Sequence, residues 1–155
     1  MATIFDKNFI DFLNCLNKKN ARFILVGGLA SVIHGVNRVT GDMDIYIDAT
    51  TDNAQKVLDA IKDFGFGSIG FTTEDLLNAD IVVQMGREPL RIDILCDLPG
   101  LIFKDAFENA IKFETEGVQI KVIHITDLIR NKELVGREKD KMDVNVLKKK
   151  LKAKK

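Results

Sequence analysis

The stretch Phe23-Ile-Leu-Val-Gly-Gly-Leu-Ala-Ser-Val-Ile-His-Gly-Val-Asn-Arg-Val-Thr-Gly-Asp-Met-Asp-Ile-Tyr-Ile47 decides the fold class. It opens with an apolar run typical of a buried strand, which ends at Gly27-Gly28. A short helical stretch over residues 29–34 follows. Over residues 42–47 apolar and polar side chains alternate, which predicts a strand with one face in a core. A strand, a glycine turn, a helix and a second strand favour a mixed α/β fold.

The rest of the chain adds helices and strands in mixed order. We therefore predict an α/β (α+β) fold, a small twisted mixed sheet flanked by helices, in which residues 1–155 form one domain. The patterns predict helices over residues 6–19, 51–64, 101–111, 126–135 and 138–151, a helical turn at 73–77, and strands over 81–85, 90–95 and 118–124, the last paired with 112–115. Residues 86–89 would close a hairpin. The expected helix N-caps are Asp6, Thr51 or Asp52, and Thr126.

Composition narrows the class of protein. With 46% hydrophobic and 30% charged residues, the chain is an ordinary globular sequence. Two cysteines make no disulfide framework, and both lie in apolar stretches, so we expect buried free thiols in a reducing compartment. The sequence shows neither an apolar run long enough to span a membrane nor the pattern of a signal peptide. We therefore expect a cytoplasmic protein that does not act at a membrane.

Charge is unevenly distributed along the chain. Residues 137–155 carry nine Lys/Arg against three Asp/Glu, a net charge of +6, and the remainder carries −6. Apolar residues at helical spacing in this basic C-terminal segment predict that its first half packs on the domain. From Lys148 onward the lysines have no obvious acidic partners, so they form either a solvated tail or a contact with RNA phosphates.

Three aspartates are candidates for catalysis and metal binding. Residues i and i+2 of a strand share a face, so Asp42 and Asp44 would lie together. Asp93 is a lone carboxylate in a second apolar strand, and the three converge if the two strands are neighbours. Three such carboxylates can hold two Mg²⁺ ions. The alternative is that Asp42 and Asp44 mark a solvent-facing strand edge.

The glycines complete the pattern. Gly27 and Gly28 lie between a strand and a helix, where backbone N–H groups can approach a phosphate closely. A phosphate-binding turn together with metal-binding carboxylates is typical of phosphoryl or nucleotidyl transfer. The chain lacks both the P-loop motif and the Rossmann glycine fingerprint.

These motifs resemble the DNA polymerase beta-type nucleotidyltransferase superfamily, and most closely its small bacterial AbiEii-like branch. Members read Val-Gly-Gly-x-Ala, His-Gly and Arg-x-Thr-x-Asp-x-Asp, as residues 26–44 do here. The stretch 125–143 is similar to the branch's later helix, with a Lys, an Arg and a Lys-Asp-x-x-Asp cluster. The resemblance covers about residues 20–145.

The resemblance implies a role for each matching residue. Asp42, Asp44 and Asp93 would be the catalytic and metal-binding residues, with two Mg²⁺ ions or Mn²⁺ in their place, and Asp93 would activate the acceptor hydroxyl. Residues implied to bind the nucleotide are Gly27, Gly28, Arg38, Thr40 and Lys132. We expect His34 and His124 to be structural, and Arg137, Asp140 and Asp143 to form either part of this site or a surface set of ion pairs.

The function that the resemblance implies is transfer of a nucleoside monophosphate from an NTP to an acceptor hydroxyl. The acceptor could be tRNA, a protein or a small molecule, and a toxin–antitoxin type of system, with a partner protein, fits the branch. The alternative is a non-catalytic nucleotide- or partner-binding module, the antitoxin or regulatory half of a two-protein system.

Overall fold

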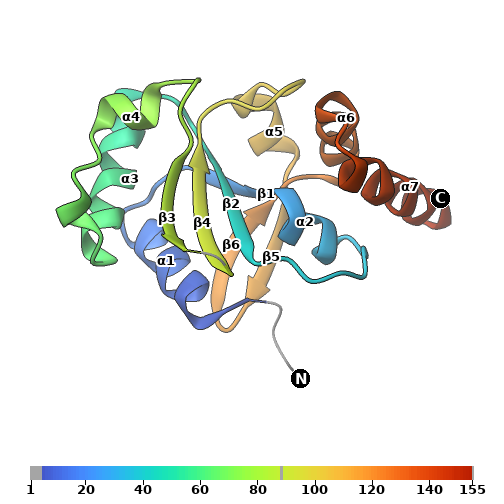
Figure 1. The fold of residues 1–155 in the computed structure, drawn as a ribbon, viewed down its shortest axis with the longest axis horizontal. Helices are drawn as coiled ribbons and strands as arrows, with labels where there is room; N and C mark the ends of the chain where they lie inside the picture. Colours follow the sequence, from blue (N-terminus) through green and yellow to red (C-terminus); the bar gives the residue numbers. More distant parts are fainter. Residues whose placement is uncertain (1–4, 88, 155) are drawn as a thin grey trace.

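A six-stranded mixed sheet runs through the molecule, in the order β3-β4-β2-β1-β6-β5 (Figure 1). The structure is a computed structural model and describes residues 5–87 and 89–154. β1 pairs parallel with β6 and antiparallel with β2, β2 pairs parallel with β4, and β3–β4 and β5–β6 are antiparallel. The predicted fold class is therefore confirmed. The strands are β1 (Phe23–Val26), β2 (Asp42–Ile47), β3 (Val83–Arg87), β4 (Leu90–Leu95), β5 (Ile111–Thr115) and β6 (Val118–Val122).

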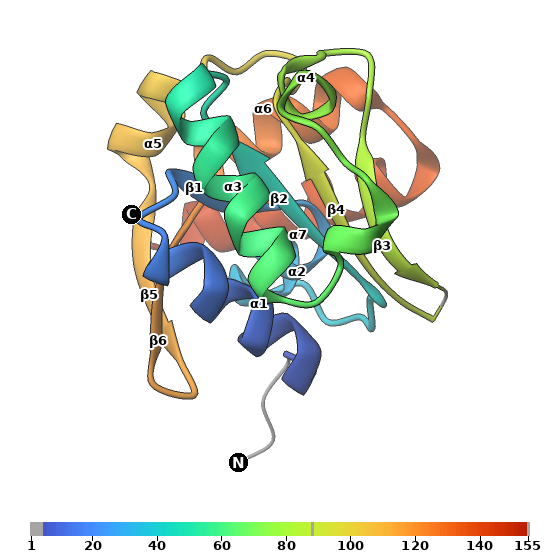
Figure 2. The same ribbon diagram turned by 90° about the vertical axis from the view of Figure 1, so that its left-hand side faces the viewer.

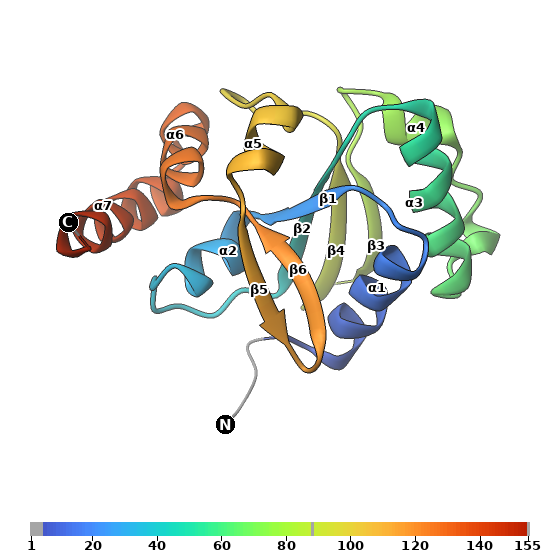
Figure 3. The same cartoon turned by 180° about the vertical axis from the view of Figure 1, so that it is seen from behind.

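Helices lie on both sides of the sheet. α1 and α3 cover one face, which Figure 2 shows from the front, and α2, α6 and α7 lie on the other side (Figure 1). Figure 3 shows the β5–β6 hairpin and α1 from behind. None of the helices in the described residues is long and apolar enough to cross a membrane. The helices are α1 (Lys7–Lys18), α2 (Gly27–Ile33), α3 (Thr51–Asp63), α4 (Thr73–Leu77), α5 (Phe103–Asn109), α6 (Ile125–Val135) and α7 (Glu138–Ala153), with a 3-10 turn at Gly67–Ile69.

Alternation along β2 separates the core from the polar face. Met43, Ile45 and Ile47 are fully buried, and so are Phe12 and Leu13 of α1 in the same core. Because successive side chains of a strand point to opposite faces, the aspartates of β2 are turned to the face that carries α2. Burying a large aliphatic side chain contributes about 1.5–3 kcal/mol, so this alternation holds β2 in one register.

Several element boundaries differ from those predicted. β3 begins at Val83 rather than residue 81, because Ile81 and Val82 are 37% and 46% exposed and the cross-strand register, not hydropathy, sets the strand. α5 is shorter than predicted, because residues 111–115 leave the helix to pair with β6.

Two of the three predicted N-caps are wrong. Asp6 caps α1 as expected, but Thr50, not Thr51 or Asp52, caps α3 through a hydrogen bond from the N–H of Asn53. His124, not Thr126, caps α6. α3 begins at Thr51, as predicted, so its cap is the residue before it, and α6 begins at Ile125, one residue before the predicted start, so its cap is His124.

The basic C-terminal segment is helical through Ala153 and packs on the domain. Val144 and Leu147 are buried, which confirms the apolar stripe predicted for α7. The expectation that Lys148 lacks an acidic partner is wrong: its Nζ lies 3.0 Å from Oε2 of Glu133 on α6. Both cysteines are free thiols, half-buried rather than buried.

Candidate active site

The register of β2 against β4 brings the candidate aspartates together. Asp44 lies directly opposite Asp93, and Asp42 lies opposite Arg91, in a parallel pairing of the two strands. All four side chains project from one face of the sheet, since residues two apart on a strand share a face. β2 is an interior strand, so the alternative of a solvent-facing strand edge is wrong.

Arg91 links two of the three carboxylates. Its Nε donates to Oδ1 of Asp93 at 2.7 Å, and its Nη2 donates to Oδ2 of Asp93 and to Oδ2 of Asp42, both at 3.1 Å. Charge-assisted bonds from a planar guanidinium are among the strongest hydrogen bonds in proteins. The Arg91 and Asp42 side chains remain 26% and 30% exposed, while Asp93 is 10% exposed.

Asp44 is the carboxylate whose charge is least compensated. Burial, and after it the charges of the neighbouring Asp93 and Asp42, raise its pKa to about 6, against a lowering effect of Lys132 and Arg137. The hydrogen bonds of the described residues include none to this carboxylate. Such a group gains most from a nearby cation.

The carboxylates fit a hard divalent cation in their chemistry. All of the candidate ligand atoms are carboxylate oxygens, which Mg²⁺ and Mn²⁺ prefer. Oδ1 of Asp42 is buried and has no hydrogen-bond partner in the described residues, so it can accept a further ligand. In this arrangement, however, no group of three or more His, Cys, Asp or Glu side chains in residues 5–87 and 89–154 is gathered closely enough to hold a metal.

The predicted glycine turn is the first turn of a helix. α2 begins at Gly27 rather than residue 29, and Gly27 has a φ of +70°, in the left-handed region. A Cβ at Gly27 would collide with the carboxylate of Asp44. At this position the chain therefore needs glycine both for its backbone conformation and for the approach of β2.

Gly28 lies close to two other predicted site residues, Arg38 and Thr40. A Cβ there would stand 2.9 Å from Oγ1 of Thr40 and 3.2 Å from Nη2 of Arg38. The structure therefore brings Gly27, Gly28, Arg38 and Thr40 to one place beside Asp44.

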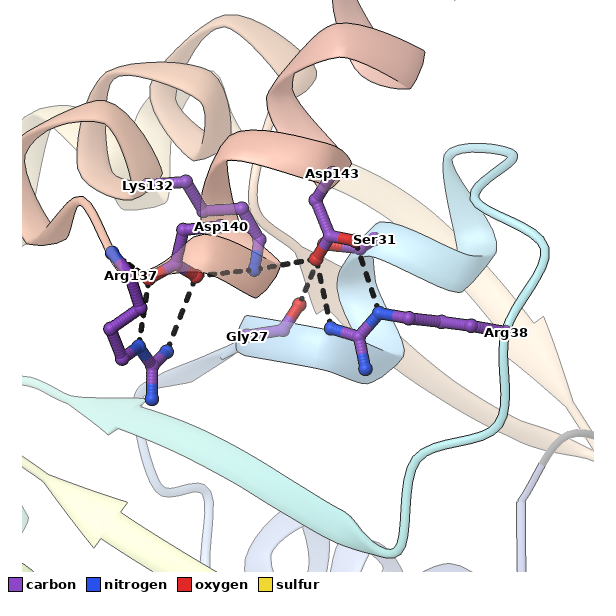
Figure 4. A network of polar contacts seen from close by, with 7 residues as sticks. All are labelled: Gly27, Ser31, Arg38, Lys132, Arg137, Asp140 and Asp143. Atoms are coloured by element: carbon purple, nitrogen blue, oxygen red, sulfur yellow. Dashed lines mark hydrogen bonds and ion pairs between the residues drawn. The ribbon is translucent and has the colours of Figure 1, made fainter.

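A buried network of charges anchors this place to the two C-terminal helices (Figure 4). Arg38 donates to both oxygens of Asp143, at 3.0 and 2.8 Å. Lys132, only 4% exposed, lies 3.0 Å from Asp143 and 3.2 Å from Asp140. Arg137 is the last member of this network and forms an ion pair of 2.7 Å with Asp140. Lys132 thus makes its ion pairs with Asp140 and Asp143, and its charge also acts on Asp44.

The two carboxylates of the network are almost completely buried, Asp140 at 1% and Asp143 at 2% exposure. Burial alone would raise the pKa of each, but hydrogen bonds from Arg137, Arg38 and Lys132 leave both pKa values below the ordinary range. The alternative that Arg137, Asp140 and Asp143 form only a surface set of ion pairs is therefore wrong. Losing one partner of a buried pair typically costs about 3–5 kcal/mol.

Sequence reasoning missed Arg91. Its position two residues before Asp93 placed it on the same strand face, which is the signal that could have found it. The histidines take structural positions: the ring of His34 is buried and its Nε2 lies 2.7 Å from the carbonyl oxygen of Ile123, and His124 caps α6. Burial lowers the pKa of His34, in keeping with a neutral, packed ring.

Comparison with known proteins supplies a family. A comparison with curated proteins finds no match to this chain. A family model, by contrast, matches residues 6–155, which include β2, β4, α2 and the whole buried network. The chain belongs to that family, which is described as a nucleotidyl transferase of unknown function (DUF2204).

Proposed function

We propose that the protein transfers a nucleoside monophosphate from an NTP to an acceptor hydroxyl, with Mg²⁺ bound at Asp42, Asp44 and Asp93. The observation that carries the proposal is the register of Asp44 opposite Asp93, with Asp42 on the same face. Carboxylates placed in this way, in a chain of a nucleotidyl transferase family, support a centre for phosphoryl chemistry.

Each side of the site has a distinct role in this proposal. Bound Mg²⁺, in one or two ions or replaced by Mn²⁺, supplies charge stabilisation for the attacking and leaving oxygens. Asp93 accepts the proton of the acceptor hydroxyl, whose oxygen attacks the α-phosphorus of the NTP, and pyrophosphate leaves. The backbone N–H groups of Gly27 and Gly28, in the first turn of α2, would bind phosphate oxygens, and Arg38 and Thr40 lie beside Gly28. Lys132 holds Asp143, and through it Arg38, in position.

The acceptor defines the finer function. We propose the AbiEii-like branch as the nearest type, on the motifs in residues 26–44 and 125–143. Its acceptor is then tRNA, a protein or a small molecule, and a partner protein of a toxin–antitoxin type of system is expected. We place the protein in the cytoplasm, where NTPs and Mg²⁺ would be available as substrate and cofactor.

The test incubates the protein with a cell extract, Mg²⁺ or Mn²⁺, and one α-³²P-labelled NTP at a time. The transferred label is then measured separately in the RNA, protein and small-molecule fractions. We expect label in one fraction, its loss with Asp93→Asn, and no loss with the surface control Asp80→Asn. Circular dichroism checks that each variant is folded. Absence of transfer to any fraction with every nucleotide and both metals would contradict the proposal.

A second function, a non-catalytic nucleotide-binding module, has one observation in its favour. Arg91 engages both oxygens of Asp93 and one of Asp42, so two of the carboxylates are already neutralised by the chain itself. For such a module, NTP binding measured by calorimetry would be insensitive to Asp93→Asn. In the transferase, binding of the NTP with its metal weakens in that variant.

A further inference from the structure

Arg91 bridges two of the three candidate metal-binding carboxylates. Its guanidinium uses both oxygens of Asp93 and Oδ2 of Asp42. Oδ1 of Asp42 is buried and has no hydrogen-bond partner in the described residues. A cation that binds Asp42 and Asp93 together therefore competes with this guanidinium for their oxygens.

The backbone of Arg91 is fixed, while its side chain is partly exposed. Its N–H donates to the carbonyl of Gly41 at 3.1 Å, and the residue is paired on both sides, with Asp42 of β2 and Gly86 of β3. The side chain is 26% exposed. Gly86, its direct neighbour on β3, contributes no side chain that would confine the guanidinium on that flank. A long side chain on a rigid strand can thus leave the carboxylates without any change in the sheet.

We propose that Arg91 is a displaceable counter-ion that competes with the divalent metal for Asp42 and Asp93, and so sets the metal affinity of the site. This inference rests on the proposed function, since it takes these carboxylates as the metal site. Arg91 is then a positioning residue: it holds Asp42 and Asp93 together in the metal-free protein. It yields them when a metal arrives, and its freed guanidinium has the geometry to bind phosphate oxygens.

The direction of the mutational effect separates competition from a merely structural salt bridge. If Arg91 only supported the fold, its loss would loosen the carboxylates and weaken metal binding. If it competes, its loss frees three carboxylate contacts and removes a positive charge, so metal binding becomes tighter. Arg91→Lys keeps the charge but loses the planar fork that spans both carboxylates, so its affinity should lie between those of the wild type and Arg91→Met.

The experiment is a Mn²⁺ titration of the full chain without nucleotide, followed by the electron paramagnetic resonance of free Mn²⁺. The variants are Arg91→Met, Arg91→Lys and, as matched control, Arg87→Met, which removes an exposed arginine from the same hairpin. We expect Arg91→Met to lower the Mn²⁺ dissociation constant at least about tenfold, roughly 1.4 kcal/mol. Arg87→Met should change it less than about twofold.

Each outcome decides the matter. An unchanged or weaker affinity in Arg91→Met overturns the role of Arg91 while leaving the metal site in place. An equal gain of Mn²⁺ affinity in Arg87→Met would mean that the loss of any nearby positive charge tightens binding, and this also overturns the role of Arg91. Absence of Mn²⁺ binding in every protein, including the wild type, overturns the metal site of the proposed function itself. Circular dichroism monitors folding, and if Arg91→Met does not fold, Arg91→Lys carries the test, with a gain of at least about threefold expected.

Discussion

Replacing Asp44 by asparagine should stabilise the metal-free protein at neutral pH. The pKa of Asp44 is raised from 3.8 to about 6 by burial and by the charges of Asp93 and Asp42. At about 1.4 kcal/mol for each pH unit, that difference amounts to roughly 3 kcal/mol. Because the side chain is only half-buried, solvent screening reduces the expected gain to about 2 kcal/mol.

The sign follows from proton linkage. The folded chain holds the Asp44 proton to a higher pH than the unfolded chain does, so the unfolded chain ionises first as the pH rises. Stability from the neutral carboxyl is present in full below pH 3.8, and is lost as the pH rises to about 6. Asparagine is neutral throughout, so the advantage of Asp44→Asn should grow between these two pH values and stay constant above them.

Urea denaturation of the metal-free protein, at a series of pH values from about 4 to about 8, measures this difference directly. Asp80→Asn, an exposed carboxylate in a turn, is the control and should show no such trend. With Mn²⁺ present the order should reverse, because Asp44→Asn lacks a metal ligand and gains nothing from the ion. An advantage of Asp44→Asn that is independent of pH, or a loss of stability at about pH 8, would refute the reasoning.

Three further variants test the rest of the site. Asp143→Asn should destabilise the chain by about 3–5 kcal/mol in urea denaturation, because Lys132 loses a buried partner; a change below about 1 kcal/mol would contradict the buried network. Gly28→Ala should weaken NTP binding in calorimetry about tenfold, since its methyl group would stand 2.9 Å from Oγ1 of Thr40 and displace that side chain; circular dichroism checks the fold, and equal affinity would remove Gly28 from the nucleotide site. If the acceptor is RNA, deleting residues 148–155 should lower RNA affinity and flatten its salt dependence with NTP binding intact, whereas a full-length chain without RNA affinity at low salt excludes that acceptor.

Local patterns predicted the elements that carry the site. The alternation over residues 42–47 predicted β2, and the apolar run around Asp93 predicted β4; the structure confirms both strands. Such patterns are informative because burial of one strand face imposes a period of two residues. The adjacency of β2 and β4 was a condition of the three-carboxylate prediction, and their parallel pairing meets that condition, although in the described residues the three carboxylates are not gathered closely enough to hold a metal. The position of β3 was wrong by two residues, since strand register depends on the partner strand rather than on hydropathy.

The pairing of charges that are far apart in the chain could not be predicted from the sequence. Arg38 and Asp143 are 105 residues apart, and nothing in either segment indicates that they meet. Lys132 was predicted to line the nucleotide site, yet its burial to 4% exposure follows from the packing of α6 against α7, which no local pattern specifies. For the same reason a Lys-Asp-x-x-Asp cluster looks in sequence like a solvated helix face.

The two charged systems meet at Asp44. Asp93 and Asp42 raise its pKa from the sheet side, while Lys132 and Arg137 lower it from the helical side. α7 therefore contributes to the site through its buried carboxylates, which hold Arg38 and Lys132 beside α2, although its second half carries the lysines that make it look like an appended tail. The family match extends through residue 155 and so includes this helix. A site whose cations are fixed by buried partners is preorganised, and electrostatic preorganisation is the contribution that phosphoryl-transfer chemistry asks of a protein.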